Sequence, residues 1–427
     1  MLKSILFIFS FCALIAQDFF WGVAISEYQS SGAETVNNCN WTTWEKNSGI
    51  FSGKSNDHYN NYQTHIDAIE DLGGNAFRFS LEWSMIEPSE GVFDEAVIEH
   101  YREEIKALLA SGITPMVTMH HFTEPLWFTE KGSFEKEANI AHFERYAKRV
   151  FSEYKDLVKF WGVINEPTVM SYMPYWFGDF PPHKKNIKVA FKVLKHLLIS
   201  HVNVYATCKE IMPSAQIGFV HSYLPFQSYK GDLMEIMVSD LMTKIWNDSV
   251  VNFFLKGKLD LELPFCGYLH YNNPGAVDSF DFVGINYYAT PMLKYTPFEG
   301  NWFVTSCREG QLMTDMPYHI DPEGFYKCLL RCKEFNKPIY VTENGIADDK
   351  DDRREIYIES YLASMKRAMN DGADIRGYFY WTLFDNFEWH HGYDKQFGLY
   401  DLDKDTFEFK IKNGGLAYKR AIHTFFD

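Results

Sequence analysis

Residues 158–167 read VKFWGVINEP, an apolar run that predicts a buried β-strand and delivers Glu166 where the strand ends. Residues 338–345, PIYVTENG, repeat this arrangement and place Glu343 at the end of a second strand. Two carboxyl groups presented in this way are what the cleavage of a glycosidic bond requires. One must hold a proton near neutral pH and give it to a departing oxygen, while the other must stay ionised and attack or stabilise a developing oxocarbenium centre.

The same kind of β-like run recurs along the whole chain, and each run ends in polar residues. The predicted strands are 19–26, 76–81, 114–121, 158–165, 216–222, 280–288, 338–344 and 375–383. Amphipathic segments between them predict helices, most clearly at 58–72, 95–110, 140–154, 187–211 and 353–371. Eight alternating β and α units predict an α/β protein with a single (β/α)₈ TIM barrel, whose active site lies at the C-terminal ends of the strands. No Pro-, Gly- or Ser-rich linker and no repeat interrupts the series, so we expect residues 17–427 to form one catalytic domain.

Polar and aromatic side chains are dense at the predicted strand ends. They are Arg78, His121, Asn165, Glu166, Asn286, Tyr288, Glu343 and Trp381. One histidine or asparagine at such a place is more often a structural residue than a ligand. Eight such groups at one end of a barrel favour a catalytic site.

Composition narrows the class of partner. Of the 427 residues, 46% are hydrophobic and 23% charged, which is typical of a globular protein. The aromatic share, 17%, suits stacking against sugar faces, although most of these rings are expected in the core. A formal net charge of −16 argues against binding to nucleic acid or to anionic lipid. The acidic run at 348–352, DDKDD, is most simply a solvated loop, because the pattern of a calcium-binding EF-hand is absent.

The first residues form a separate unit. Lys3 precedes a short apolar stretch over residues 5–16, which is typical of a signal peptide and too short for a membrane span of about 20 residues. We therefore expect residues 1–16 to be a signal peptide and the protein to be secreted or periplasmic. If the stretch is instead an uncleaved anchor or a misassigned start, the protein is not exported, and a cytoplasmic location follows.

The cysteines do not indicate a metal site. Cys12 lies in the expected signal peptide, and the remaining six are too sparse for a disulfide scaffold and lack the spacing of zinc ligands; they are Cys39, Cys208, Cys266, Cys307, Cys328 and Cys332. Buried thiols are the default expectation, with one or two bridges possible in an oxidising compartment. Whether any disulfide forms stays open.

Several longer strings together resemble family 1 of the glycoside hydrolases, the β-glucosidase and β-galactosidase group, from Phe20 to about Phe426. The strings are FWGVA at 20–24 with Tyr28 and Gln29, FRFSLEWS at 77–84, HHFTEP at 120–125, NEP at 165–167, GINYY at 284–288, TENG at 342–345 and YWTLFDNFEW at 380–389. Any one of them could arise by chance. Their occurrence in the family's order, at intervals that match a barrel, makes the resemblance specific.

The resemblance implies a retaining β-glycosidase. Glu166 resembles the family's general acid/base and Glu343 its nucleophile, with their carboxyl groups about 5–5.5 Å apart. Asn165 resembles the residue that hydrogen-bonds the sugar 2-hydroxyl. Arg78 and Tyr288 resemble the groups that keep Glu343 ionised and oriented.

The resemblance also implies how the sugar is held. The ring is expected to lie on Trp381, while the remaining substrate-binding positions are Gln29, His121, Asn286, Glu388, Trp389 and Phe397. Family members that act on 6-phosphorylated sugars lack a carboxylate at the position of Glu388, since an anion there would repel a phosphate. A neutral hexoside is therefore expected, with β-glucoside foremost.

Some positions depart from the family pattern. Phe122 stands where the family usually has Trp, Met85 where an Arg commonly follows, and Ser30 and Ser31 where an acidic residue normally precedes Gly32. None of these changes removes a catalytic group. They bear on support of the sugar site, so they weaken the detailed binding roles more than those of the two glutamates.

No metal or organic cofactor is implied, because carboxylates and water suffice for the chemistry. His120 and His121 are adjacent on a predicted strand and should point to opposite faces, which argues against a shared metal ion. The expected partner is a small-molecule or oligosaccharide β-glycoside.

Two other functions remain open. A glycan-binding barrel could keep the fold without turnover, although both glutamates are present here. Transglycosylation, in which a sugar or alcohol replaces water, would use the same residues. The choice among gluco, galacto and fuco sugars, the leaving group and the oligomeric state cannot be read from the sequence.

Overall fold

The computed structural model describes residues 19–297 and 303–427, so the expected signal peptide lies outside the described residues. Eight parallel strands close into a barrel in the order β1-β13-β12-β9-β5-β4-β3-β2. The strands are β1 (Phe20–Ala24), β2 (Ala76–Ser80), β3 (Thr114–His120), β4 (Phe160–Asn165), β5 (Gln216–Ser222), β9 (Phe282–Asn286), β12 (Ile339–Asn344) and β13 (Ile375–Trp381). All eight predicted strands are confirmed, as is the (β/α)₈ fold class.

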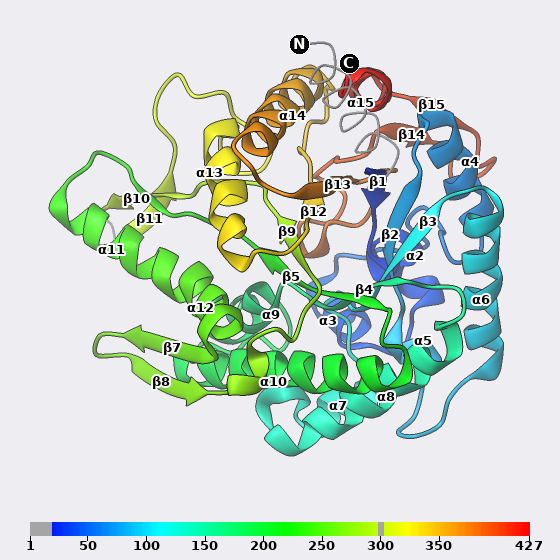
Figure 1. The fold of residues 1–427 in the computed structure, drawn as a ribbon, viewed down its shortest axis with the longest axis horizontal. Helices are drawn as coiled ribbons and strands as arrows, with labels where there is room; N and C mark the ends of the chain where they lie inside the picture. The colour runs from blue at the N-terminus through cyan, green and yellow to red at the C-terminus, as the bar shows by residue number, and fades with distance from the viewer. Residues whose placement is uncertain (1–18, 298–302) are drawn as a thin grey trace, which may run out of the picture.

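A ring of helices surrounds the barrel (Figure 1). One helix of the ring follows each strand, namely α4 (Tyr62–Leu72), α6 (Glu95–Ala110), α8 (Ile140–Tyr154), α10 (Ile187–Ile211), α12 (Ser249–Lys256), α13 (Pro322–Cys332), α14 (Arg354–Asn370) and α15 (Asn413–Thr424). Three of the five helices predicted from periodicity have the predicted bounds, and the other two differ only at their ends. Among the described residues, no helix is both long enough and apolar enough to cross a membrane.

Local signals fix the helix ends. The Asp94 carboxylate accepts hydrogen bonds from the backbone N–H groups of Ala96 and Val97, which caps the start of α6. Helix α4 ends at Gly73, whose φ of 81° is a left-handed conformation that glycine adopts without strain.

Further helices and strands lie in the connections between the barrel strands. The helices are α2 (Glu27–Thr35), α3 (Asn40–Ser48), α5 (Trp83–Ile86), α7 (Leu126–Glu130), α9 (Pro167–Tyr172) and α11 (Leu233–Thr243). The strands β6 (Gln227–Ser228), β10 (Met292–Tyr295) and β11 (Phe303–Ser306) form one small sheet, β7 (Lys258–Leu263) pairs with β8 (Gly267–Asn272), and β14 (Tyr400–Leu402) pairs with β15 (Phe409–Ile411).

Two hydrophobic clusters hold the fold together. The larger one lies between the barrel and the helices. The smaller one comprises Ala24, Ala76, Met116, Phe282, Tyr340, Ala347, Phe379, Trp381 and Phe397, with Phe20, Phe160, Tyr288 and Met316 packed against it. This smaller cluster extends from the barrel interior to side chains of the predicted sugar site, namely Tyr288, Trp381 and Phe397.

Candidate active site

The two glutamates stand where the sequence predicted. Glu343 is the second-last residue of strand β12, and Glu166 directly follows β4. Glu166 has a φ of 47°, a left-handed conformation that is uncommon for a residue with a side chain and that clusters at functional sites. Its backbone N–H donates to the carbonyl of Val220 at 3.0 Å, which fastens the turn between β4 and α9 to strand β5.

Glu343 is held by two donors. Arg78 Nη1 lies 2.5 Å from Glu343 Oε1, and the hydroxyl of Tyr288 donates to Glu343 Oε2 at 2.7 Å. Arg78 is fully buried, so its charge acts on this carboxylate with little screening by water. Each carboxylate oxygen therefore receives a hydrogen bond that stabilises the ionised form.

Glu166 has a different environment. Burial and the neighbouring charge of Glu343 raise the pKa of Glu166 to about 8, although a hydrogen bond from Asn286 Nδ2 at 2.9 Å opposes this shift. At neutral pH this carboxyl group therefore keeps its proton. One glutamate is prepared to donate a proton, and the other receives donors that favour its charge.

A chain of hydrogen bonds between buried polar side chains connects the two glutamates. Asn165 Oδ1 accepts hydrogen bonds from Arg78 Nη2 at 2.7 Å and from Asn286 Nδ2 at 3.2 Å, while Thr342 Oγ1 donates to Asn286 Oδ1 at 2.7 Å. Arg78, Asn165 and Asn286 are completely buried and do not line the adjoining cavity. In this structure Arg78 contacts Glu343 and Asn286 contacts Glu166, whereas Asn165 links Arg78 to Asn286.

The remaining predicted residues surround a cavity of about 260 Å³ at the C-terminal end of the barrel. Its walls are Gln29, His121, Phe122, Glu166, Val169, Phe180, Ser222, Leu224, Tyr288, Ala289, Pro291, Met316, Tyr318, Glu343, Trp381, Glu388, Trp389 and Phe397. Both catalytic candidates, Glu166 and Glu343, line this cavity. No lysine or arginine is among these described lining residues, so the cavity offers no cationic partner for an anionic substrate.

Aromatic rings form one wall of the cavity. His121 stacks against Trp381 with ring centroids 5.9 Å apart and against Trp389 at 6.3 Å. Phe122, at the position where the family usually has Trp, packs against Trp389 at 5.3 Å and has a φ of 68°. The smaller ring therefore keeps contact with the wall that the sugar is expected to meet.

A polar end of the cavity is formed by Gln29 and Glu388. Gln29 Nε2 donates to Glu388 Oε2 at 3.2 Å and to the carbonyl of Phe387 at 3.0 Å, while the buried Gln29 Oε1 has no hydrogen-bond partner among the described residues. Burial and the charge of Glu343 raise the pKa of Glu388 to about 8. A protonated Glu388 and the free oxygen of Gln29 can together donate to and accept from a hydroxyl group.

The two adjacent histidines face opposite sides, as predicted. His120 lies among Trp83, Phe134 and Phe143 on the outside of the barrel, whereas His121 faces Trp381 and the cavity. Burial lowers the pKa of His120 to about 3 and the pKa of His121 well below its ordinary value. Both rings are therefore neutral at pH 7. Strand β3 ends at His120, so His121 is the first residue after the strand.

Sequence reasoning missed several lining residues. Ser222 ends strand β5, so the rule that strand ends carry the site could have found it. Leu224, Met316 and Tyr318 lie in irregular connections and carry no pattern that points to the cavity. The six cysteines of the described residues are all free thiols.

An eight-stranded barrel with a proton-holding glutamate and an arginine-bound glutamate in one aromatic cavity defines a glycoside hydrolase of the barrel type. The chain belongs to glycosyl hydrolase family 1, whose model matches residues 13–425. It is accordingly an O-glycoside hydrolase.

Proteins of known structure and name agree with this assignment. The chain is 31% identical over 433 residues to a 1,4-beta-D-glucan glucohydrolase of Thermotoga neapolitana, covering 95% of this chain and 97% of the relative. A beta-glycosidase from Pyrococcus horikoshii superposes with a TM-score of 0.86 at 32% identity, covering 95% of this chain and 94% of that one. The beta-glucosidase from Thermotoga maritima in complex with glucoimidazole gives a TM-score of 0.85 at 29% identity, covering 96% and 98%.

Proposed function

We propose that this enzyme hydrolyses terminal β-linked neutral hexosides, β-glucosides foremost, by a double displacement that retains the anomeric configuration. The observation that carries the proposal is the contrast between the two glutamates. Glu166 has a pKa of about 8, whereas Glu343 receives hydrogen bonds from Arg78 and Tyr288. This division of environments is what the two steps require. The relatives named beta-glucosidase or glucan glucohydrolase support the choice of sugar.

In the first step, Glu343 Oε attacks the anomeric carbon and forms a covalent ester with the sugar. The bond between that carbon and the leaving oxygen breaks at the same time, and Glu166 gives its proton to the leaving oxygen, so an alcohol departs. Glu166 becomes a carboxylate when Glu343 loses its charge to the ester. The two charges are therefore never present together, which suits two coupled groups in a low-dielectric site.

In the second step, Glu166 acts as a base. It takes a proton from a water molecule, whose oxygen attacks the anomeric carbon, and the ester bond to Glu343 breaks. The products are the free sugar with its original configuration, a protonated Glu166 and an ionised Glu343. The enzyme thus returns to its starting state.

The cavity favours an uncharged sugar ring. Its volume of about 260 Å³ suits one ring more than a long oligosaccharide, and aromatic faces from Trp381 and Trp389 are available for stacking. A sugar phosphate would share the cavity with the Glu343 carboxylate, and no lysine or arginine is among the described lining residues to pair with its charge. We therefore expect exclusion of 6-phosphoglucosides.

Turnover of a panel of nitrophenyl β-glycosides tests the proposal. Purified protein lacking residues 1–16 is assayed with the glucoside, galactoside, fucoside, mannoside and 6-phosphoglucoside. We expect turnover of neutral sugars, the glucoside foremost, and none of the phosphorylated one. A folded protein that binds these glycosides without turning over any of them is a glycan-binding barrel instead.

Variants of the two glutamates test the mechanism. We expect Glu343→Gln to lower kcat more than about 10⁴-fold for every glycoside, because no nucleophile remains. Glu166→Gln should lose about 10²- to 10⁴-fold on poor leaving groups and much less on dinitrophenyl glucosides, which leave without a proton.

Glu82→Gln is a matched control, because Glu82 is a buried carboxyl near the end of strand β2 and does not line the cavity. Its kcat should stay close to that of the wild type. An equal loss in Glu343→Gln and Glu166→Gln on all leaving groups would refute the assignment of roles.

Export of the enzyme is a separate proposal. It rests on the charged residue and apolar stretch within residues 1–16. Expression of the full chain, followed by N-terminal sequencing of protein recovered outside the cytoplasm, tests it. Full-length protein retained inside the cell would contradict it.

A further inference from the structure

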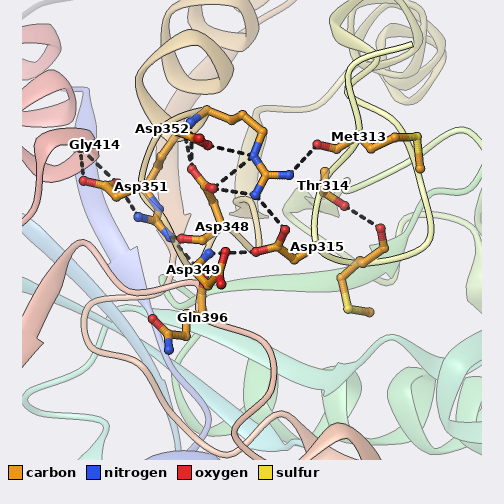
Figure 2. A network of polar contacts seen from close by, with 12 residues as sticks. Met313, Thr314, Asp315, Asp348, Asp349, Asp351, Asp352, Gln396 and Gly414 are labelled. Carbon is orange, nitrogen blue, oxygen red and sulfur yellow. Dashed lines mark hydrogen bonds and ion pairs between the residues drawn. The ribbon is translucent and has the colours of Figure 1, made fainter. Parts of the chain in front are cut away.

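A network of ion pairs lies beside the active-site end of the barrel, between the loops that follow strands β11, β12 and β13 (Figure 2). The sequence predicted residues 348–352 to be a solvated acidic loop. This is wrong for Asp348, which is fully buried. Its carboxylate caps helix α14 by accepting hydrogen bonds from the backbone N–H groups of Arg353 and Arg354 at 2.8 and 2.9 Å. A carboxyl group this deeply buried requires hydrogen-bond partners.

Arg353 is the centre of the network. Its Nη2 lies 2.6 Å from both Asp315 Oδ1 and Asp348 Oδ1, its Nη1 donates to the carbonyl of Met313 at 2.8 Å, and its Nε donates to Asp348 Oδ1 at 3.0 Å. All three guanidinium nitrogens are therefore engaged. Because the guanidinium is planar and rigid, these contacts fix the loop of Met313 and Asp315 relative to the start of helix α14.

The loop that Arg353 contacts has little regular secondary structure, although Lys395 Nζ also donates to the carbonyl of Asp315 at 2.8 Å. Residues 307–321 contain no helix or strand, apart from one isolated bridge between Met313 and His319. The Asp315 backbone N–H donates to the carbonyl of Ala347 at 2.9 Å, and the Asp349 N–H donates to Asp315 Oδ2 at 2.7 Å. The same face of the loop thus meets the connection between β12 and α14 at three points.

The third loop joins the network through its backbone. Asp348 N–H donates to the carbonyl of Gln396 at 2.9 Å, and Arg354 Nη2 donates to the same carbonyl at 2.9 Å. Gln396 directly precedes Phe397, which lines the cavity. The network therefore reaches the wall formed by the chain after β13.

These contacts continue into the cavity wall. Met316 and Tyr318, one and three residues after Asp315, line the cavity. Ala347, directly before Asp348, belongs to the same hydrophobic cluster as Trp381 and Phe397, and Met316 packs against that cluster. A shift of the loop around Asp315 would move side chains that touch the substrate space, whereas Glu343 is held independently by Arg78 and Tyr288.

The acidic groups are better explained by Arg353 than by a metal ion. One ligand oxygen each from Asp315, Asp348 and Asp349 could meet within 4.8 Å of one another. The Arg353 guanidinium already pairs with Asp315 and Asp348, so it supplies the positive charge that a bound metal ion would otherwise supply. The acidic cluster alone does not make a site.

We propose that Arg353 is a positioning residue for substrate binding, which fixes the Met316 and Tyr318 wall of the cavity by tying its loop to Asp348. The proposal rests on the proposed glycosidase function for its kinetic readout. It places Arg353 outside the substrate space and assigns to it an effect on affinity rather than on the chemical step.

Steady-state kinetics of Arg353→Ala on a nitrophenyl β-glucoside provide the test. We expect KM to rise about 3- to 10-fold while kcat stays within about twofold, since coupling through a contacting loop is modest in size. Arg353→Lys keeps the charge but cannot reach all three partners, so its KM should be intermediate. Arg420→Ala is the control, because Arg420 forms one exposed pair with Glu355 and should leave KM unchanged.

A double-mutant cycle separates positioning from general stability. If Arg353 acts through the loop, the effects of Arg353→Ala and Tyr318→Ala on KM will not add. Additive effects, or a lower melting temperature with unchanged KM, would overturn the proposal. If Arg353→Ala does not fold, Asp315→Ala removes the carboxyl group through which Arg353 holds the loop and leaves the pair between Arg353 and Asp348 intact.

A binding measurement keeps the proposal distinct from the enzyme's activity. The Kd of nitrophenyl β-thioglucoside, which resists hydrolysis, should rise in Arg353→Ala by the same factor as KM. A wild-type protein without turnover would refute the proposed function alone, because the Kd comparison still decides the role of Arg353. An unchanged Kd would overturn that role.

Discussion

The proton on Glu166 limits catalysis at alkaline pH. Because the pKa of Glu166 is raised to about 8, this carboxyl group is protonated below that pH and loses its proton above it. We expect kcat/KM for a glycoside with a poor leaving group, such as a methyl or phenyl β-glucoside, to fall about tenfold for each pH unit well above 8. A pH–rate profile between pH 5 and 10 measures this.

The same profile with a dinitrophenyl glucoside serves as the comparison. Its leaving group needs no proton, so the alkaline fall should be much weaker. The fall should also disappear in Glu166→Gln. If it persists there, another group controls the alkaline limb, and Glu388 would be the first candidate because its pKa is also about 8.

A departure from the family pattern at Ser31 is compensated four residues upstream. Glu27 and Ser31 are one helical turn apart on α2, and the Ser31 hydroxyl donates to the Glu27 carboxylate. That carboxylate lies 3.1 Å from His58 Nδ1, while Glu104 lies 3.3 Å from His58 Nε2. Although burial opposes the charge, Glu27 and Glu104 raise the pKa of His58 to about 10. Glu27 therefore supplies to His58 the negative charge that an acidic residue at position 31 would supply.

Exchanging the two residues tests this compensation. Glu27→Ser should destabilise the fold by about 3–5 kcal/mol, because a buried imidazolium loses a partner. Glu27→Ser combined with Ser31→Glu should recover most of that loss, since the carboxylate returns one turn along the same helix face. Urea unfolding at pH 7 measures both, and Glu34→Ser, at an exposed position of the same helix, is the control. A double variant no more stable than Glu27→Ser would refute the exchange.

Among individual residues, the sequence predicted the side chains that perform the chemistry but not all of those that line the cavity. Glu166 and Glu343 could be found because a strand end is recognisable from an apolar run and fixes where the next side chain stands. Tyr318 and Arg353 could not, because each acts through contacts made by irregular loops. Their neighbours in space come from other connections of the barrel, and no local pattern records that proximity.

The barrel strands could be predicted from the sequence, whereas the short strands in the connections were missed. Most residues of the barrel strands are buried whichever face they lie on, so most of these strands read as apolar runs. Exceptions are Arg78 and Ser80 in β2 and the exposed Arg376 in β13. The hairpin of β7 and β8 was missed, although its signal was present: KLDLEL at 258–263 alternates buried leucines with exposed charged residues. The two-residue strand β6 has no such signal, since it pairs only because the chain around Met292 lies beside it.

A layer of aromatic side chains from the barrel strands fills the barrel interior. These side chains do not line the sugar cavity. The rings of Phe20, Phe160, Phe282 and Tyr340 come from strands β1, β4, β9 and β12, and their centroids lie 5.0–6.4 Å apart. A Cβ atom added at Gly218 would come within 2.2 Å of the Phe282 ring, so glycine is needed there to admit that ring. The layer is thus a close-packed plug.

We expect Phe282→Ala to lower the free energy of unfolding by about 3–5 kcal/mol, since the cavity it leaves is confined by the barrel wall. Gly218→Ala should cost about 1–3 kcal/mol through overpacking against the same ring. Denaturant unfolding measures both. Because neither residue lines the sugar cavity, kcat of folded protein at low temperature should stay within about twofold of wild type. A large loss of kcat at full folding would mean that this layer controls the site.

Over the whole molecule, buried ionisable groups divide into two opposing sets. Burial raises the pKa of Glu82 and Glu124 to about 7, and burial together with the Glu343 charge raises the pKa of Glu166 and Glu388 to about 8. Burial lowers the pKa of several histidines, to about 3 for His120 and to about 4 for His201, His221 and His391. The folded state therefore keeps protons on these carboxyl groups and excludes them from these histidines, whereas His58, whose pKa is raised to about 10, keeps its proton.

The pH dependence of stability follows from these two sets. Below pH 6.5 the unfolded chain binds protons on histidines that the folded protein keeps neutral, so through these histidines a rise in pH stabilises the fold. The buried carboxyl groups have the opposite effect, because they keep protons in the folded protein, and the histidines offset it. Above pH 6.5 the unfolded histidines are neutral, and the raised carboxyl groups and His58 leave the folded protein with more bound protons than the unfolded chain. Stability must then fall as pH rises.

We therefore expect the melting temperature to be highest near pH 6.5 and to decline clearly between pH 6.5 and 8.5. Scanning calorimetry or fluorescence melting at constant ionic strength measures this. Glu388→Gln removes one of the raised carboxyl groups, so its decline should be shallower than that of the wild type, whereas Glu34→Ser, at an exposed position, should leave the slope unchanged. A melting temperature that keeps rising to pH 8.5 would show that these buried carboxyl groups are ionised in the folded protein, and the proton that Glu166 is proposed to donate would then be in doubt as well.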